Sequence, residues 1–362
     1  MVNFAKKWYE KYFVDDEAVI LVLLLAAAFV VIFFLGKVLA PFFTALIFAY
    51  MLQGLVGAMQ ARGVRSIVAV GVSYLFFLGL MASIFVFVLP LVWQQGINLL
   101  YEIPGMAREM QGVLMALPER FPNLITPDQI RSWVGDATRE LGALAQKLLT
   151  ASFAKIPTLV GLIIYIVLVP ILVFFLLKDR DLLLGKLSHL LPAKRSFLVA
   201  VWNETNRQMG NYIRGKGVEI VIVAVVTYIT FALLGLNYAA LLAIVTGFSV
   251  LIPYIGAAVV TLPVAAVAFW QFGLEAPFFS VIVAYAIIQA LDGNVLVPIL
   301  FSEAVSLHPV SIILAVLIFG GLWGFWGLFF AIPLATLIKA IVTAWPVGIE
   351  QASSEQETGG IA

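Results

Sequence analysis

Asp292 is the residue whose type and position most suggest chemistry, because it is the only charged residue of an otherwise apolar predicted helix at about 278–300. An ionised carboxylate at the centre of a bilayer costs about 3 kcal/mol unless it faces water or a partner, so it marks a functional path by default. Gln289 lies one turn before it on the same helix face, and Asn294 lies two residues after it. A polar staple between helices, or an interfacial position, would give the same pattern.

Two Gly- and Pro-rich breaks in the C-terminal part are the other candidates for chemistry. Broken helices at membrane depth are tolerated only where protein or a water-filled cavity surrounds them. The freed carbonyls can coordinate a cation or a hydroxyl-rich solute, although a purely structural turn, or close helix packing on small residues, explains the breaks equally well. The candidate path residues at the breaks are Pro253, Tyr254, Gly256, Gly320, Gly321, Gly324 and Gly327.

The sequence lacks the residues and motifs for catalysis, metal binding or nucleotide binding. The chain has no Cys and only two His, His189 and His308, so it has no disulfides, thiolate metal sites or catalytic thiols. No HExxH, GxSxG or nucleotide-binding loop occurs. We therefore expect no enzyme activity, no catalytic residue, no metal and no cofactor, and the net charge of +1 gives no surface for nucleic acid.

The composition places these candidates in a membrane protein. Of the 362 residues 63% are apolar and 11% charged, whereas soluble domains have about 45–50% and about 25%. Charge-free runs mark the spans, because a helix needs roughly 20 apolar residues to cross a bilayer. The runs of 55 residues before Glu275 and of 35 residues before Lys339 must each contain more than one element.

We therefore predict an all-α polytopic membrane protein with about six full spans and two re-entrant or short helical hairpins, eight or more membrane segments in all. The arms of the hairpins measure roughly 21–26 Å, which is short of the ~30 Å hydrocarbon core. The predicted spans are 18–35, 38–55, 66–90, 157–177, 218–235 and 278–300, and the hairpins pair 239–252 with 256–272 and 309–324 with 327–345.

The predicted organisation has six parts. They are transmembrane helices 1–3 (1–92), an extracytoplasmic helical arm (93–156), transmembrane helix 4 (157–177), a basic cytoplasmic loop (178–217), a C-terminal transport core (218–345) and a flexible cytoplasmic tail (346–362). The arm contains two apolar stripes at helical spacing and is either a hairpin that packs on itself or a neighbour, or an arm that collects substrate.

The orientation follows from the eight Lys and Arg residues in 178–217, which place that segment in the cytoplasm. Counting spans in both directions then places both termini in the cytoplasm.

The C-terminal part contains a weak internal repeat. Thr261-Leu262-Pro263-Val264-Ala265 and Ala331-Ile332-Pro333-Leu334-Ala335 lie 70 residues apart, each after a Gly-containing break. The longer helices before the two hairpins run in opposite directions, as in inverted-repeat transporters whose sites lie at broken helices. Chance similarity of apolar, Gly-rich sequence is the alternative.

A series of motifs in the last 110 residues resembles the autoinducer-2 exporter family of PerM-like permeases. The motifs are Ile252-Pro253-Tyr254-Ile255-Gly256, Gln289-Ala290-Leu291-Asp292-Gly293-Asn294-Val295-Leu296-Val297-Pro298, Leu307-His308-Pro309 and Gly320-Gly321-Leu322-Trp323-Gly324-Phe325-Trp326-Gly327. The order of spans is also similar, so the resemblance covers nearly the whole chain. Ser302-Glu303 departs from the family, which commonly has a Gly there.

The resemblance implies a bacterial inner-membrane permease that exports small solutes, the signal molecule autoinducer-2 among them, as a homo-oligomer, a pentamer. It also implies, as an alternative, a sodium–proton antiporter, and a non-transporting membrane scaffold is the other class left open. The expected partners are membrane lipid, a small-molecule or ion substrate and further copies of the chain.

Overall fold

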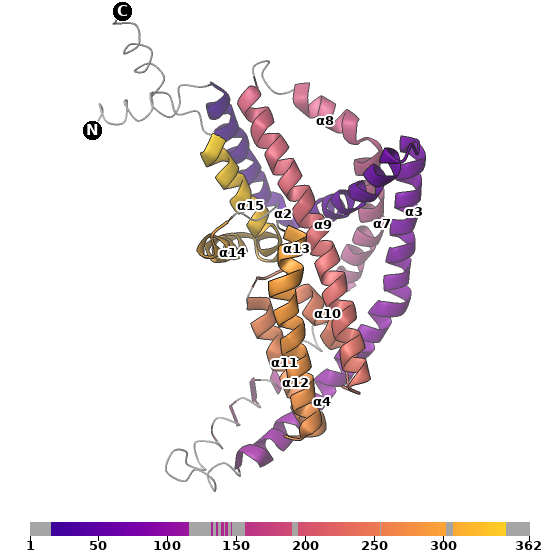
Figure 1. The fold of residues 1–362 in the computed structure, drawn as a ribbon, viewed down its shortest axis with the longest axis vertical. Coiled ribbons are helices and arrows are strands. Elements are labelled where there is room, and N and C mark those ends of the chain that lie inside the picture. Colours follow the sequence, from indigo (N-terminus) through magenta and orange to yellow (C-terminus); the bar gives the residue numbers. More distant parts are fainter. Residues whose placement is uncertain are drawn as a thin grey trace, which may run out of the picture. The chain divides into compact units, whose positions relative to one another are not determined.

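The computed structural model describes residues 16–115, 156–189, 195–253, 255–301 and 307–344, with eight separate positions between 132 and 146. Every regular element in these residues is a helix, which confirms the all-α prediction (Figure 1). The chain divides into two compact units. The first comprises Met1–Val70, Ile171–Arg214 and Glu303–Ala362, and the second comprises Gly71–Pro170 and Gly215–Ser302.

The first unit begins with α2 (Asp16–Ala61), a continuous helix of 46 residues. The predicted spans 18–35 and 38–55 correspond to the apolar segments Val19–Gly36 and Val38–Ala61, but no break in the helix separates them. The residues between the predicted spans are a single Gly and a single Lys, and a lone glycine costs a helix only about 1 kcal/mol relative to alanine. Pro41 also lies inside α2 without ending it. The helix ends instead where Gly63 adopts a φ of 85°.

The segment 178–217, predicted as a loop, is largely helical. α7 (Ile156–Lys178) is followed by α8 (Arg180–His189) and by α9 (Ser196–Leu233), which begins well before the predicted start at residue 218. Charge counting hid the helical period of early α9, in which apolar side chains, Leu198 and Val201 among them, are buried. Glu17 of α2 accepts backbone hydrogen bonds from the first turn of α9.

In the second unit α3 (Ser66–Ser83), a π-helical turn η1 (Ile84–Val88) and α4 (Leu89–Met115) follow one another without a break. The first part of the predicted external arm is thus the C-terminal part of α4. It packs on the next elements of the same unit: Gln95 Oε1 accepts from the Leu241 backbone N–H, and the Tyr238 hydroxyl donates to Glu102. The second predicted helix of the arm falls mostly outside the described residues.

The first hairpin lies wholly in the second unit and has the predicted form. α9 ends at Gly235, whose N–H bonds to the Ala232 carbonyl while the Leu236 N–H bonds to the Phe231 carbonyl, a Schellman motif. α10 (Ala239–Ser249) and α11 (Ile255–Phe272) then pack together around a core that includes Leu242 and Val264. α12 (Ala276–Leu291), η2 (Asp292–Leu296) and α13 (Val297–Phe301) follow as one helical run.

The second hairpin lies in the first unit. α14 (Pro309–Trp323) begins with His308, whose Nδ1 accepts from the Val310 N–H, and ends at Gly324, which has a φ of 57°. α15 (Phe325–Ala344) returns along it. The predicted helix breaks are confirmed in both hairpins, whereas re-entrance into the membrane stays a prediction.

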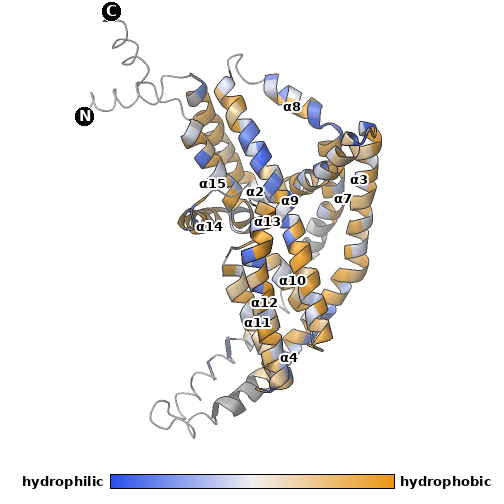
Figure 2. Cartoon of the chain, viewed as in Figure 1, coloured by the Kyte–Doolittle hydropathy of each residue, from blue (hydrophilic) through white to orange (hydrophobic). Residues whose placement is uncertain are grey.

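The helices are apolar over most of their length, as a multi-pass membrane protein requires (Figure 2). Within the described residues seven helical segments are long and apolar enough to cross a membrane: Val19–Gly36, Val38–Ala61, Ser66–Met106, Ser196–Leu233, Ile255–Phe272, Ala276–Phe301 and Phe325–Thr343. The first arms of the two hairpins and Ile163–Lys178 are shorter apolar helices. Five of the six predicted spans are among these segments, and 157–177 corresponds to the shorter helix Ile163–Lys178. The other two segments are the second arms of the hairpins, which were predicted as arms too short to cross the membrane.

Candidate functional site

Asp292 lies inside the helical run from Ala276 to Phe301, as predicted, and it opens the π-helical turn η2. The Val297 N–H bonds to the Asp292 carbonyl, five residues back, so the turn holds one residue more than an α-helical turn. Such π-turns occur frequently at functional sites. Oδ1 of Asp292 is buried and has no hydrogen-bond partner among the described residues, and the same holds for Nε2 of Gln289.

A buried ion pair lies within electrostatic reach of Asp292. Lys216 and Glu219, one turn apart on α9, are 5% and 1% exposed. The Lys216 ammonium donates to Glu219 Oε1 at 3.0 Å and lies 2.8 Å from Oε2. Asp292 interacts electrostatically with Lys216 and with Glu219. We call Lys216, Glu219 and Asp292 the charge cluster.

The break of the first hairpin completes the surroundings of Lys216. Its ammonium also donates to the carbonyl of Val250, the C-cap residue of α10, at 2.8 Å, and lies 5.2 Å from the centre of the Phe301 ring. Val250 comes three residues before Pro253, where the hairpin turns. The interrupted helix therefore supplies a backbone carbonyl to the charge cluster.

Gly256 holds the two arms of the first hairpin together. A Cβ atom there would lie 1.8 Å from the carbonyl oxygen of Ser249, so only glycine allows this approach of the two backbones. Pro253 lies in the turn itself, where its carbonyl accepts from the Ile255 N–H at 2.7 Å. Tyr254 is outside the described residues. Both described residues of this break thus have a structural role beside the charge cluster.

The second hairpin repeats the close approach of the two backbones. A Cβ atom at Gly327 would lie 1.7 Å from the Phe319 carbonyl oxygen, and one at Gly320 would lie 2.6 Å from a methyl carbon of Leu328. Gly324 supplies the positive φ of the turn, and Gly321 has open space beside it. Aromatic rings surround this break: Trp323 stacks on Phe319 at 5.8 Å.

The predicted path residues therefore separate into groups. Gln289 and Asp292 come together with the charge cluster and with the turn at Pro253 and Gly256 in the second unit. The amide of Asn294 is exposed and donates to the Ala290 carbonyl of its own helix at 2.8 Å, so it stands apart. Gly320, Gly321, Gly324 and Gly327 belong to the first unit.

Sequence reasoning missed Lys216 and Glu219. It counted Lys216 among the charges of a cytoplasmic loop and used Glu219 only as the border of a charge-free run. The signal was present: a Lys and a Glu three residues apart, at the start of a long apolar stretch, can pair on one helix face. Among the described residues no group of three or more His, Asp or Glu is placed to hold a metal ion.

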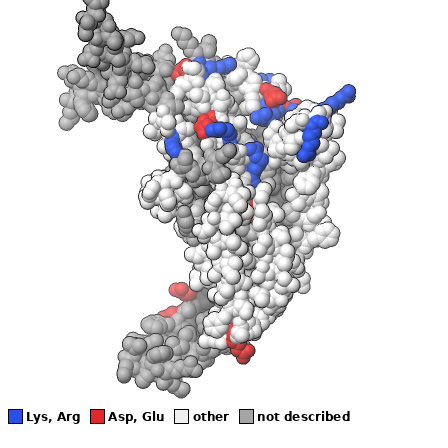
Figure 3. All heavy atoms as spheres, viewed as in Figure 1, with Lys and Arg blue, Asp and Glu red and all other residues white. Residues whose placement is uncertain are grey.

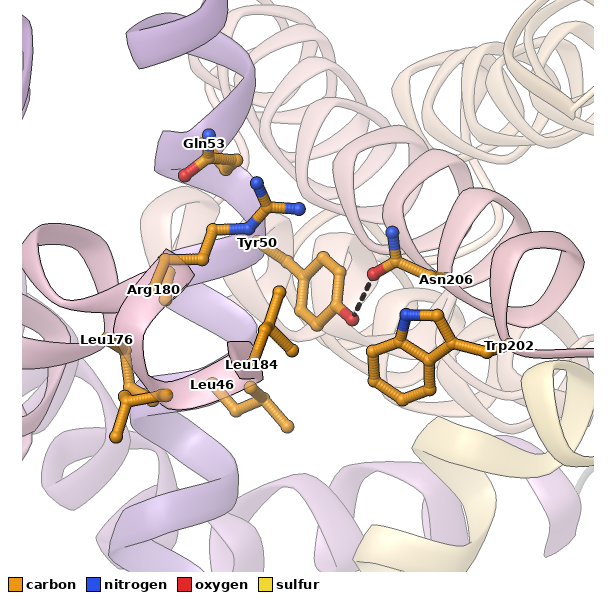
Figure 4. A pocket seen from close by; sticks show the side chains of 10 residues that line it. Leu46, Tyr50, Gln53, Leu176, Arg180, Leu184, Trp202 and Asn206 are labelled. Atoms are coloured by element: carbon orange, nitrogen blue, oxygen red, sulfur yellow. Dashed lines mark hydrogen bonds between the residues drawn. The ribbon is translucent and has the colours of Figure 1, made fainter. Parts of the chain in front are cut away.

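A pocket in the first unit is the other polar feature (Figure 4). Its volume is about 140 Å³, and its lining residues come from α2, α7, α8 and α9. The Tyr50 hydroxyl donates to Asn206 Oδ1 at 2.8 Å across it. Sequence reasoning did not single out any residue of this pocket, because its parts lie far apart along the chain.

These features define a polytopic α-helical membrane protein with Gly-broken hairpins and buried charges, the architecture of a permease. The family model described as "AI-2E family transporter" matches residues 19–347, and the chain belongs to that family. It is 46% identical to "Putative permease PerM" of Escherichia coli K12 over 348 residues, which cover 96% of this chain and 99% of that protein.

More distant relatives are also named as transport proteins. The chain is 24% identical to "Putative transport protein YrrI" of Bacillus subtilis, with 84% of this chain and 86% of that protein covered. It is 26% identical to "Putative transport protein YueF" of the same organism, with 85% and 84% covered. The resemblance noted in the sequence is thus confirmed as family membership, and the chain is a multi-pass membrane protein of a permease family.

Proposed function

We propose that this chain moves a small hydroxyl-bearing solute across the membrane, that autoinducer-2 is a candidate for that solute, and that the path passes the charge cluster at the first hairpin. Membership of the transporter family supports transport as the class of function. The description of the family model supports autoinducer-2 as the first solute to test.

The observation that carries the proposal is the pair of unpartnered buried atoms on α12 and η2. Asp292 Oδ1 accepts hydrogen bonds and Gln289 Nε2 donates them, and neither has a partner among the described residues. Residues three apart on a helix lie on one face, with about 5–6 Å between their Cβ atoms. A hydroxyl group both donates and accepts, so it can satisfy the two atoms together.

The net charge of the charge cluster also supports the binding of a hydrogen-bond donor beside Asp292. One ammonium and two carboxylates leave a net charge of −1 when all three are ionised, and an uncompensated buried charge is costly. Glu219 Oε1 accepts from Lys216, whereas Glu219 Oε2 and Asp292 Oδ1 are buried without a hydrogen-bond partner among the described residues. Because Oε2 still lies 2.8 Å from the Lys216 ammonium, Asp292 is the less compensated of the two carboxylates. A hydrogen-bond donor from a bound solute, or a proton, compensates it.

Location and assembly are parts of the same proposal. The basic residues of the first unit gather around α8, the start of α9 and the α2–α3 turn (Figure 3), which supports a cytoplasmic position for that end. We propose a bacterial inner membrane, both termini in the cytoplasm and a homo-oligomer, a pentamer by family resemblance. α2 has many exposed apolar side chains, Phe34 and Val38 at 75% among them, for contacts with lipid or with further copies.

The test is solute flux into liposomes that contain the purified protein. We expect uptake of autoinducer-2 or of another hydroxyl-bearing solute above protein-free liposomes, and at least about tenfold slower uptake of a matched analogue without the hydroxyl, the effect of leaving buried polar groups unpaired. Sodium-dependent proton movement without solute flux would instead indicate the antiporter, which the relatives do not support. If the protein in the liposomes transports neither solute nor ions, the result would indicate a non-transporting scaffold.

A further inference from the structure

The pocket of the first unit is amphipathic. Figure 4 shows the polar ends of Gln53, Arg180 and Asn206 on one side of it and leucine side chains on the other. The lining residues are Leu46, Ala49, Tyr50, Gln53, Leu176, Arg180, Leu183, Leu184, Trp202 and Asn206. A ligand that fits has both a polar group and an apolar part.

Among the described residues that line the pocket, Arg180 alone is charged. Its ion pair among the described residues is with Asp181 at 3.8 Å, and the Asp181 side chain is 97% exposed. An exposed pair of this length contributes little, so the guanidinium keeps most of its donors for a ligand. Because its donors form a rigid planar fork, it suits a phosphate, which it can bind through two hydrogen bonds.

The position along the chain puts the pocket at the membrane surface. Arg180 comes two residues after the end of the apolar helix Ile163–Lys178. Trp202, 46% exposed, lines the same pocket, and Trp is enriched at the level of the lipid headgroups. Basic pockets between helices on the cytoplasmic side bind anionic lipid headgroups.

We propose that this pocket binds the headgroup of an anionic phospholipid, with the phosphate on Arg180 and the start of an acyl chain on the leucine wall. The volume of about 140 Å³ admits a headgroup fragment rather than a whole lipid, since pockets that enclose drug-sized ligands measure about 300–1,000 Å³. Leu183, which is 45% exposed, continues the apolar wall toward the lipid. The site does not depend on the proposed transport function.

The test compares lipids and variants by the shift in melting temperature of the purified full-length chain in detergent. The probes are dioleoyl phosphatidylglycerol, dioleoyl phosphatidylcholine and inorganic phosphate at equal concentrations. We expect a larger shift with phosphatidylglycerol than with phosphatidylcholine, and no shift with phosphate. Phosphate that reproduces the whole phosphatidylglycerol shift would overturn the lipid assignment.

Arg180→Gln and Lys178→Gln form the matched pair. Both remove one positive charge at the junction of α7 and α8, but Lys178 is not among the residues of the pocket. We expect Arg180→Gln to weaken the apparent affinity for phosphatidylglycerol about five- to tenfold and Lys178→Gln to leave it within about twofold. Equal weakening by both variants would reduce the effect to general surface charge and overturn the proposal.

A third variant covers the case in which Arg180→Gln does not fold. Arg180→Lys keeps the charge and loses the fork, so we expect it to fold and to bind phosphatidylglycerol about two- to fivefold more weakly than the wild type. Native mass spectrometry of the wild type provides a test that needs no variant. We expect the protein to retain phosphatidylglycerol in preference to phosphatidylcholine. Equal retention of the two lipids would contradict the proposal.

Discussion

The two hairpins are built alike and differ in what surrounds them. In each, a glycine at the start of the second arm lies against a carbonyl at the end of the first: Gly256 against Ser249, and Gly327 against Phe319. Beside the first hairpin lies the charge cluster, whereas the second hairpin is packed among aromatic rings such as Trp323 and Phe319. The shared backbone geometry agrees with the internal repeat predicted from the sequence.

The difference shows that the glycine-broken hairpin is a scaffold and does not by itself define a site. Both breaks expose backbone groups, and in the hydrogen bonds of the described residues it is the first that brings a carbonyl, that of Val250, to a buried ammonium. Chemistry therefore follows the polar residues contributed by α9 and α12–η2. Three sets of substitutions test this division, from the largest expected effect to the smallest.

Gly256→Ala and Gly327→Ala should be the most damaging substitutions, and equally so. Each adds a Cβ atom less than 2 Å from a backbone carbonyl oxygen, so each should lower the free energy of unfolding by about 5 kcal/mol or more. Chemical denaturation in detergent and the gel-filtration profile measure the effect. Gly321→Ala is the matched control, because nothing lies within 4 Å of its Cβ position. Tolerance of only one of the two would break the structural equivalence of the hairpins.

Lys216→Met should come next, and it tests the charge cluster beside the first hairpin. It leaves Glu219, 1% exposed, without its ammonium, and breaking a buried pair from one side costs about 3–5 kcal/mol. The double variant Lys216→Met with Glu219→Leu should return to within about 1 kcal/mol of the wild type in the same denaturation experiment. A single variant as stable as the wild type would show that the pair is not buried as described.

Trp323→Phe should have the smallest effect. The Nε1 atom of Trp323 is buried without a hydrogen-bond partner among the described residues, and phenylalanine keeps the ring contacts with Phe319 and Phe29. We expect a change within about 1 kcal/mol in stability and unaltered solute flux. Loss of flux in a folded variant would place transport chemistry at the second hairpin and remove the contrast.

Local signals predicted much of this structure. Gly235 ends α9 through a Schellman motif, as its glycine suggested, and both hairpins break where Gly and Pro gather. Asp292 lies inside a helical run because apolar residues extend on both sides of it. These features depend on residues that are close together in the sequence, so a single sequence is sufficient to predict them.

Features that depend on contacts between residues far apart in the sequence could not be predicted. Whether the chain turns after Gly36 is decided by packing along all of α2, since one glycine neither forces nor forbids a turn. The sequence alone indicates that Lys216 is a charge of a cytoplasmic loop. Its burial depends on Glu219 and on the carbonyl of Val250, which lies 34 residues further along the chain. The pocket at Arg180 joins α2 to α9 across more than a hundred residues.

The most direct test of the central claim is solute flux in liposomes for Asp292→Asn beside Glu275→Gln. Both replace an acid by its amide in the same helical run, but Glu275 is exposed at the N-cap of α12. The account predicts that Asp292→Asn folds and assembles yet loses flux by about tenfold or more, while Glu275→Gln stays within about twofold. Wild-type flux through folded Asp292→Asn would contradict it and make the buried carboxylate structural.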